Sequence, residues 1–279
     1  MRWVILFLIC ILASCASGSL PDQESHGEIA PPEGELLRRG DLLVSNLRQL
    51  SDGFHREEHF AIYRQGELCG MRFCTLDATG AGPTQSLKLE ERMAIFTNGS
   101  WQVSRAQWNL AHDWKPVSLR LIMRTTQVFQ PPSVKVFAMN RDATGFSLAM
   151  RKDGKDYNAH IKEPQGWFCS TPELVIPWLQ ATDKPYSLRT LLFESGDLAE
   201  VTVIPHSMEH RDGLSFQVLE MRAPRQTKGE ILTVASEPPG ALMSRTLLAC
   251  KGNMKLMTQE NIRELRQKFH LPEWPEFPL

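Results

Sequence analysis

Apolar and polar residues alternate with a period of two over most of the chain, which is typical of β-strands that bury one face. The clearest alternating runs are 87–95, 146–151, 157–161 and 199–203. Tight-turn dipeptides separate such runs, at Gln65-Gly66, Asn98-Gly99, Asp153-Gly154 and Asp212-Gly213. Many strands joined by short turns predict an antiparallel meander rather than alternating strands and helices.

Helical spacing interrupts this alternation in three places. The spacing of leucines predicts a helix over about 41–50, since Gly40 weakens the residues before it. A capping pattern at 170–173 predicts a second helix that ends near Gln180, and a third is expected from Thr258. The expected fold is therefore mainly β: a large curved antiparallel meander sheet, or half-barrel, wrapped around one or two helices.

The most apolar segment lies at the N-terminus. Arg2 precedes ten apolar residues, Trp3–Leu12, a run that is short for a membrane span and typical of a signal peptide. The following Leu12-Ala13-Ser14-Cys15 resembles the bacterial lipobox, in which an aliphatic residue and two small residues precede a lipidated cysteine. An ordinary signal peptide cleaved near Ala16 or Gly18 is the alternative.

The lipobox resemblance implies that Cys15 is acylated and becomes the first mature residue. Because Ala16 follows it instead of aspartate, the resemblance also implies a lipid-anchored protein of the bacterial outer membrane that faces the periplasm. The domain organisation expected from the sequence is a signal peptide (1–14), the lipidated Cys with a flexible tether (15–34), one β-rich domain (35–270) and a Pro-rich tail (271–279). The tail is either a ligand for a Pro-recognition domain or a segment pinned by its aromatic residues.

Charge and composition narrow the function classes. Lys and Arg number 31 against 32 Asp and Glu, so a basic nucleic-acid binder is not expected and nucleic acid is not an expected partner. The chain has no nucleophile-elbow motif, no phosphate-binding loop and no dinucleotide-binding glycine motif. We therefore expect no cofactor and no enzymatic activity.

Four cysteines remain if the N-terminal segment takes Cys10 and Cys15. They are Cys69, Cys74, Cys169 and Cys250. In an oxidising compartment they can form up to two disulfides, and buried thiols are the alternative. Cys69 and Cys74 would face opposite sides of an uninterrupted strand, so they pair with each other only if Gly70 marks a bulge.

The motif H-x-x-E-H occurs twice, with its histidines at His55 and His59 and at His206 and His210. Inverzincins use this spacing on a helix to place two zinc ligands on one face. Here the first copy runs into a strand-like segment, and the second lies between Pro205 and the 212–213 turn. Both contexts argue against a zinc protease, and a looser metal site built from the four histidines is the remaining metal hypothesis.

The order of signal, tether, helix and meander resembles the periplasmic lipoprotein-carrier superfamily of the LolA/LolB type and related uncharacterised families. Tyr63–Gly70 resembles the opening hairpin of the latter, and the architectural resemblance extends over about 55–257. It implies a concave apolar face that holds acyl chains, but it transfers no functional residue.

These observations predict a membrane-anchored periplasmic lipoprotein that is not an enzyme and binds an apolar ligand or an envelope protein. A metal-dependent hydrolase that uses the two H-x-x-E-H segments and a scaffolding component of an envelope assembly are the alternatives.

Overall fold

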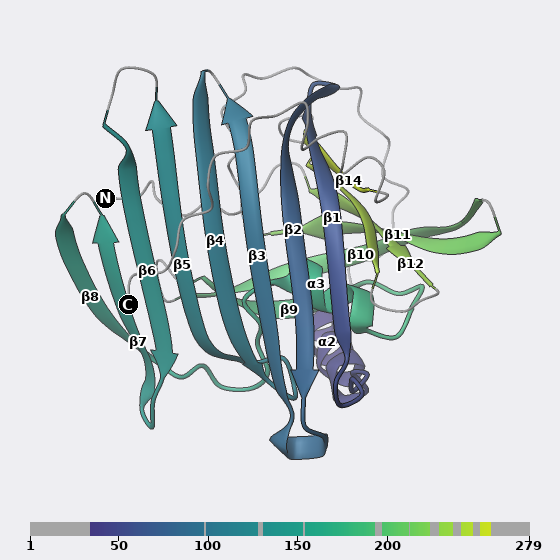
Figure 1. Cartoon of the computed structure of the whole chain (residues 1–279). Coiled ribbons are helices and arrows are strands. Elements are labelled where there is room, and N and C mark those ends of the chain that lie inside the picture. Colours follow the sequence, from purple (N-terminus) through teal and green to yellow (C-terminus); the bar gives the residue numbers. More distant parts are fainter. Residues whose placement is uncertain are drawn as a thin grey trace.

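The computed structural model describes residues 34–97, 99–127, 131–152, 154–192, 197–211, 213–223, 229–236, 241–247 and 252–257. These residues form one antiparallel sheet of 14 strands (Figure 1). The strands are β1 (His55–Arg64), β2 (Glu67–Thr79), β3 (Ser86–Thr97), β4 (Ser100–Ala111), β5 (Pro116–Gln127), β6 (Ser133–Arg141), β7 (Gly145–Lys152), β8 (Lys155–Lys162), β9 (Tyr186–Leu192), β10 (Asp197–Arg211), β11 (Leu214–Arg222), β12 (Glu230–Ala235), β13 (Leu242–Leu247) and β14 (Gly252–Leu256). The short helices are α2 (Glu35–Ser45), η1 (Gly82–Thr84), α3 (Pro172–Val175) and η2 (Ile176–Trp178).

The strand order confirms the predicted meander. Strands β1 to β8 are neighbours in chain order, and so are β9 to β14. The two series join where β1 pairs with β14, for example at Ile62 opposite Met254. The first strand of the sheet therefore lies in its interior, and β8 and β9 form the two edges.

The sheet curls around α3 and η2, which confirms the predicted half-barrel around a helix (Figure 1). Ile176 of η2 belongs to an apolar cluster that also holds Phe60 of β1 and Leu232 of β12. Trp178 belongs to a second cluster, together with Trp108 of β4. We call the strands that surround this segment, β1–β4 and β9–β14, the closed half, and we call β5–β8 the flank.

The helix over 41–50 was predicted too late in the chain, because the observed helix α2 spans Glu35–Ser45. Gly40 lies against β9 so closely that a Cβ atom there would be 1.9 Å from the Ser187 carbonyl oxygen. The glycine that lowers helix propensity is the residue that lets the helix contact the sheet, so packing decides the helix position.

The second predicted helix starts where expected, at Pro172, but only one short turn is α-helical before a 3₁₀ turn ends at Trp178. The predicted capping box is absent, since Thr171 makes no side-chain capping bond. The Glu173 carboxylate instead lies 3.3 Å from Arg245 Nη1. The helix expected from Thr258 and the Pro-rich tail 271–279 lie outside the described residues, as do the signal peptide, Cys15 and the tether.

Strand β8 departs from the predicted one-sided burial of 157–161. Seven of its eight residues are exposed, and Tyr157 retains 45% of its accessible surface. The strand lies at the edge of the flank (Figure 1), and its half-buried residue, Ile161, packs against the core cluster. Among the described helices none is long and apolar enough to cross a membrane.

Candidate functional site

Charged side chains meet inside the closed half, where an apolar core would be expected. We call them the buried charge cluster: Arg56, Glu58, Arg72, Glu91, Glu173, Glu230 and Arg245. They come from β1, β2, β3, α3, β12 and β13, so both series of strands and the enclosed helix contribute.

The first part of the cluster lies on β1–β3. The register places Glu58 opposite Cys74 and Cys74 opposite Glu91, so these three residues form a row on one face. Arg72 donates through Nε to Glu91 Oε2 at 2.8 Å, and both side chains are at least 95% buried. Such a pair is fully desolvated, so its loss would leave an uncompensated charge inside the protein.

The second part links the sheet to α3. Arg245 of β13 donates through Nε to Glu230 Oε2 at 2.7 Å and through Nη1 to Glu173 Oε1 at 3.3 Å. The Arg245 side chain is 6% exposed. One guanidinium thus holds a neighbouring strand and the enclosed helix at the same time, with the fork geometry that suits arginine.

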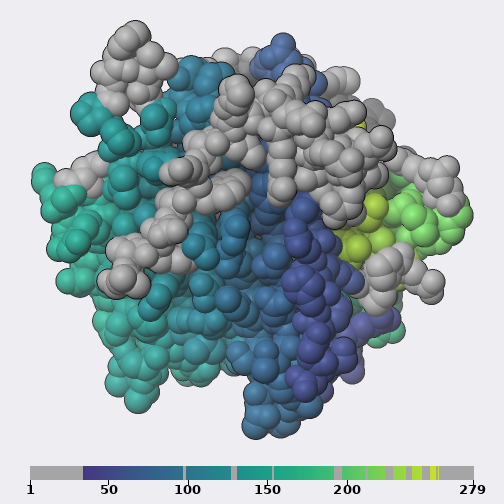
Figure 2. All heavy atoms as spheres, viewed as in Figure 1, coloured from purple at the N-terminus to yellow at the C-terminus, as the bar shows by residue number. Residues whose placement is uncertain are grey.

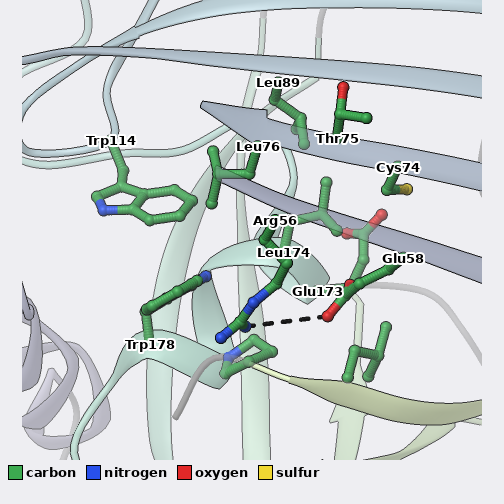
Figure 3. A pocket seen from close by; sticks show the side chains of 12 residues that line it. Arg56, Glu58, Cys74, Thr75, Leu76, Leu89, Trp114, Glu173, Leu174 and Trp178 are labelled. Atoms are coloured by element: carbon green, nitrogen blue, oxygen red, sulfur yellow. Dashed lines mark ion pairs between the residues drawn. The ribbon is translucent and has the colours of Figure 1, made fainter. Parts of the chain in front are cut away.

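A small cavity lies beside the cluster (Figure 3), between β1, β2 and the α3–η2 segment. Its volume is about 30 Å³, which is enough for about one water molecule. Arg56 and Glu58 line it, with Nη1 and Oε1 separated by 3.9 Å, and the Arg56 guanidinium also lies 4.6 Å from the centroid of the Trp178 ring. An acyl chain does not fit this space.

Burial raises the pKa of Glu58 to about 7, against the opposing influence of the Arg56 and Arg72 charges. The cluster contains three arginines and four glutamates, so a protonated Glu58 leaves three opposite charges of each sign. A neutral cluster is the less costly state in an environment of low polarity. The charge of Glu58 therefore depends on pH near neutrality.

Two buried thiols, Cys74 and Cys169, interact electrostatically with Glu173 of the cluster. Burial raises the pKa of the Cys74 thiol to about 12 and that of the Cys169 thiol likewise, and thiols of this kind are unreactive. The ion pairs of Arg245 with Glu230 and Glu173 fix α3 to strands β12 and β13.

Sequence reasoning did not find this cluster, although a signal was present. Glu91 lies between Leu89 and Met93 in the series of alternate residues that is otherwise apolar, and it interrupts that series. Glu58 and Arg72 likewise share the buried face of their strands with apolar neighbours. A charge at an apolar position of a strand predicts a buried ionic partner, which the alternation alone does not identify.

The four histidines of the H-x-x-E-H segments lie on two strands, β1 and β10, with four strands of the sheet between them. His55 Nδ1 lies 2.6 Å from Asp77 Oδ1, and His59 contacts Glu57 and the Phe73 ring. The strand expected for the first copy is confirmed, and strand geometry separates His55 from His59 by about 13 Å.

In the second copy, strand β10 runs past Pro205 and through the whole segment to Arg211. His206 hydrogen-bonds to Glu220 at 3.2 Å, and His210 to Ser215 at 2.9 Å. No three His, Cys, Asp or Glu side chains in the described parts of the chain gather as metal ligands.

The cysteines give a partial answer to the disulfide hypothesis. Cys74 and Cys169 are free thiols, and Cys250 lies outside the described residues. The pairing of β1 with β2 shifts by one residue: Ile62 pairs with Gly70, and Tyr63 pairs with Leu68. Cys69 therefore occupies a β-bulge next to Gly70, which is the condition under which the sequence allowed Cys69 and Cys74 to face the same side. Cys69 Sγ lies 3.5 Å from the Ile62 carbonyl oxygen and contacts the same apolar cluster as Cys74.

The inner face of the flank differs from the closed half. Opposite residues of antiparallel strands share a face, so the register from Trp108 through Leu119 identifies the flank residues that continue the inner face. Nearest the core this face is fully buried, at Met139 and Phe146. Further along, five apolar side chains keep part of their surface exposed, and we call them the open inner face: Leu121, Phe137, Leu148, Met150 and Tyr157.

No protein-family model matches the chain, and no curated protein matches it. Among solved structures, the chain is similar to a beta-barrel-like protein with a domain of unknown function, DUF1849, from Brucella abortus. The two share 9% sequence identity with a TM-score of 0.49, over 76% of this chain and 98% of that chain.

Proposed function

We propose that this protein is a lipid-anchored, non-enzymatic envelope protein that binds an apolar ligand with an extended acyl chain on the open inner face of the flank. The observation that carries the proposal is the partial exposure of five apolar side chains on one face of adjacent strands. Contiguous apolar surface of this kind is typical of binding sites.

The closed half argues for the flank as the place of binding. Its inner face is filled by the α3–η2 segment and the buried charge cluster, and the cavity there has a volume of only about 30 Å³. Pockets for small ligands usually have volumes of about 300–1,000 Å³. A chain-like ligand does not fit this cavity, so we place it on the flank.

A fluorescent fatty-acid analogue tests the binding site. The full chain should bind it saturably with a blue shift in emission, and Leu148→Glu should weaken binding at least tenfold because it places a charge in the apolar face. Ala149→Glu is the matched control, since Ala149 is exposed on the opposite face of the same strand, and should keep the affinity within twofold. Absence of saturable binding, or equal effects of both substitutions, would contradict the proposal.

The anchor requires a separate test. Cys15→Ser removes the thiol that the lipobox resemblance assigns to acylation, and it should move the protein from the membrane fraction to the soluble fraction. A variant that remains in the membrane fraction would refute the anchor but not the ligand site.

A further inference from the structure

The two edge strands of the sheet, β8 and β9, differ in how far other described residues cover them. The outer side of β9 is partly covered, because Cys169 pairs with Thr190 in a parallel bridge and α2 packs on the strand. Strand β8 has a described partner on one side only, β7, and its side chains are exposed along the rim of the molecule (Figures 1 and 2). An edge of this length offers a row of unpaired backbone donors and acceptors.

We propose that β8 pairs in antiparallel orientation with β8 of a second copy of this chain, about a two-fold axis at Ala159. An isologous contact of this kind places the same surface on both partners, so the strand must be complementary to itself. This proposal does not depend on the ligand function of the flank.

Backbone geometry restricts the register. Alternate residues of β8 direct their N–H and C=O groups towards β7, and the residues between them direct theirs outward. Residues that point outward must lie opposite residues that also point outward. One residue of β8 therefore lies directly opposite the same residue of the second copy, and the two-fold axis lies between these two. The same rule keeps each side chain on the face of its partner, so both inner faces become continuous.

The register centred on Ala159 matches charge with opposite charge. Lys155 then lies opposite Glu163 of the second copy, and Asp156 lies opposite Lys162. The two-fold axis repeats both contacts. Lys155 and Lys162 have no ion pair with other described residues, so both are available for a partner.

The acceptors in these contacts are Asp156, which is exposed on β8, and Glu163, which directly follows β8 and is half-buried; both are already oriented. Asp156 accepts from Arg151 Nε at 2.6 Å, and Glu163 accepts from Arg141 Nε at 3.2 Å. A carboxylate has several lone pairs and can accept from an incoming lysine as well. On the inner face, the same register places Tyr157 opposite Ile161, an aromatic next to a β-branched side chain, which is a favourable cross-strand pair.

Neighbouring registers lack this complementarity. Centred on Asn158, the pairing places Lys155 opposite Ile161 and Lys162 opposite Gly154. Centred on His160, it places Tyr157 opposite Glu163. Only the register at Ala159 pairs both lysines with carboxylates, so the strand sequence selects one arrangement among those that the backbone allows.

Disulfide cross-linking of the full chain in membranes tests the contact and its register. Ala159→Cys places the two introduced thiols opposite each other at a Cα separation of about 4.5–5.5 Å, within the range of a disulfide. It should give a cross-linked dimer on mild oxidation, above the background of the parent chain. Asn158→Cys is the control, because its symmetric thiols would be separated by about 8 Å between Cα atoms and should not cross-link.

Charge reversal in the Ala159→Cys chain tests the complementarity. Asp156→Lys should lower the cross-linked fraction at least fivefold because it opposes Lys162, and the further substitution Lys162→Glu should restore it. Comparable expression and thermal melting of the variants confirm that each folds. No cross-link at 159, equal cross-linking at 158 and 159, or no restoration by the double exchange would overturn the proposal.

Discussion

The closed half and the flank are built from the same kind of alternating strands, but the side chains of their inner faces are buried to different extents. In the closed half, the inner face meets α3 and η2, so side chains such as Phe60 and Trp108 are at least 99% buried and charges can be paired without water. In the flank, Ile161 of β8 still packs against the core cluster of Trp108 and Trp178, whereas Tyr157 of the same strand keeps 45% of its surface. What an alternating strand buries therefore depends on what the fold places against it.

The largest expected difference between the two regions concerns a buried cation. Arg245→Ala should lower the free energy of unfolding by about 3–5 kcal/mol, because it leaves the Glu230 and Glu173 carboxylates buried without their guanidinium. Urea unfolding followed by circular dichroism measures this loss. A loss below about 1 kcal/mol would show that water reaches the cluster.

Glu58 should make the closed half sensitive to pH. Its folded pKa of about 7 lies above the ordinary value of 4.5, so the folded protein binds more protons than the unfolded chain between these two pH values. The stabilising contribution is present below pH 4.5 and is lost as the pH rises to about 7, by an amount on the order of 3 kcal/mol.

Unfolding free energies measured from pH 4.5 to 8 should show this slope, and Glu58→Gln should reduce it. Glu67→Gln is the control, since Glu67 is exposed on β2, and should leave the slope unchanged. If the slope is the same in the Glu58 variant and in the parent chain, Glu58 does not titrate in this range.

The contact between α2 and β9 should be intolerant of a single methyl group. Gly40→Ala should destabilise the protein by about 1–3 kcal/mol, because the new Cβ atom would overlap the Ser187 carbonyl oxygen. Helix propensity alone predicts the opposite sign. Thermal melting distinguishes the two, with Leu42→Ala, at a 65% exposed position of the same helix, as a control of nearly unchanged stability.

The smallest effect is expected for an ion pair of the flank. Arg151 and Asp156 form a pair at 2.6 Å, but both side chains are more than half exposed. Arg151→Ala should therefore leave urea unfolding nearly unchanged, because water and salt screen the pair. A loss comparable to that of Arg245→Ala would mean that the flank is packed as tightly as the closed half.

The alternation of residues predicted the meander and placed four runs within β3, β7, β8 and β10, because the period of two is a local property of the chain. It also placed turns such as Gln65-Gly66 correctly, since both residues have positive φ angles. The curvature around α3 was expected from the combination of many strands with few helices. The position of α2 was not, because it depends on the approach of Gly40 to a strand about 150 residues away.

The site was less predictable than the fold. Glu173 matched a helix-capping pattern in the sequence, but its carboxylate contacts Arg245, 72 residues further along the chain. The histidine motif was prominent in the sequence, yet the structure separates its two copies by four strands. The partner of Glu173 and the distance between the two histidine motifs both depend on which distant segments pair in the sheet. Hydrophobic periodicity and motif spacing along the sequence do not specify that pairing.

The strand order also has a consequence for how the protein is synthesised. All described strand pairs except β1 with β14 join neighbours in the chain and can form as each hairpin leaves the ribosome. Strand β1 must keep one side open until residues 252–256 have been made. Closure of the sheet is thus a late step with a long loop, and until then β1 exposes an edge on which other chains can pair.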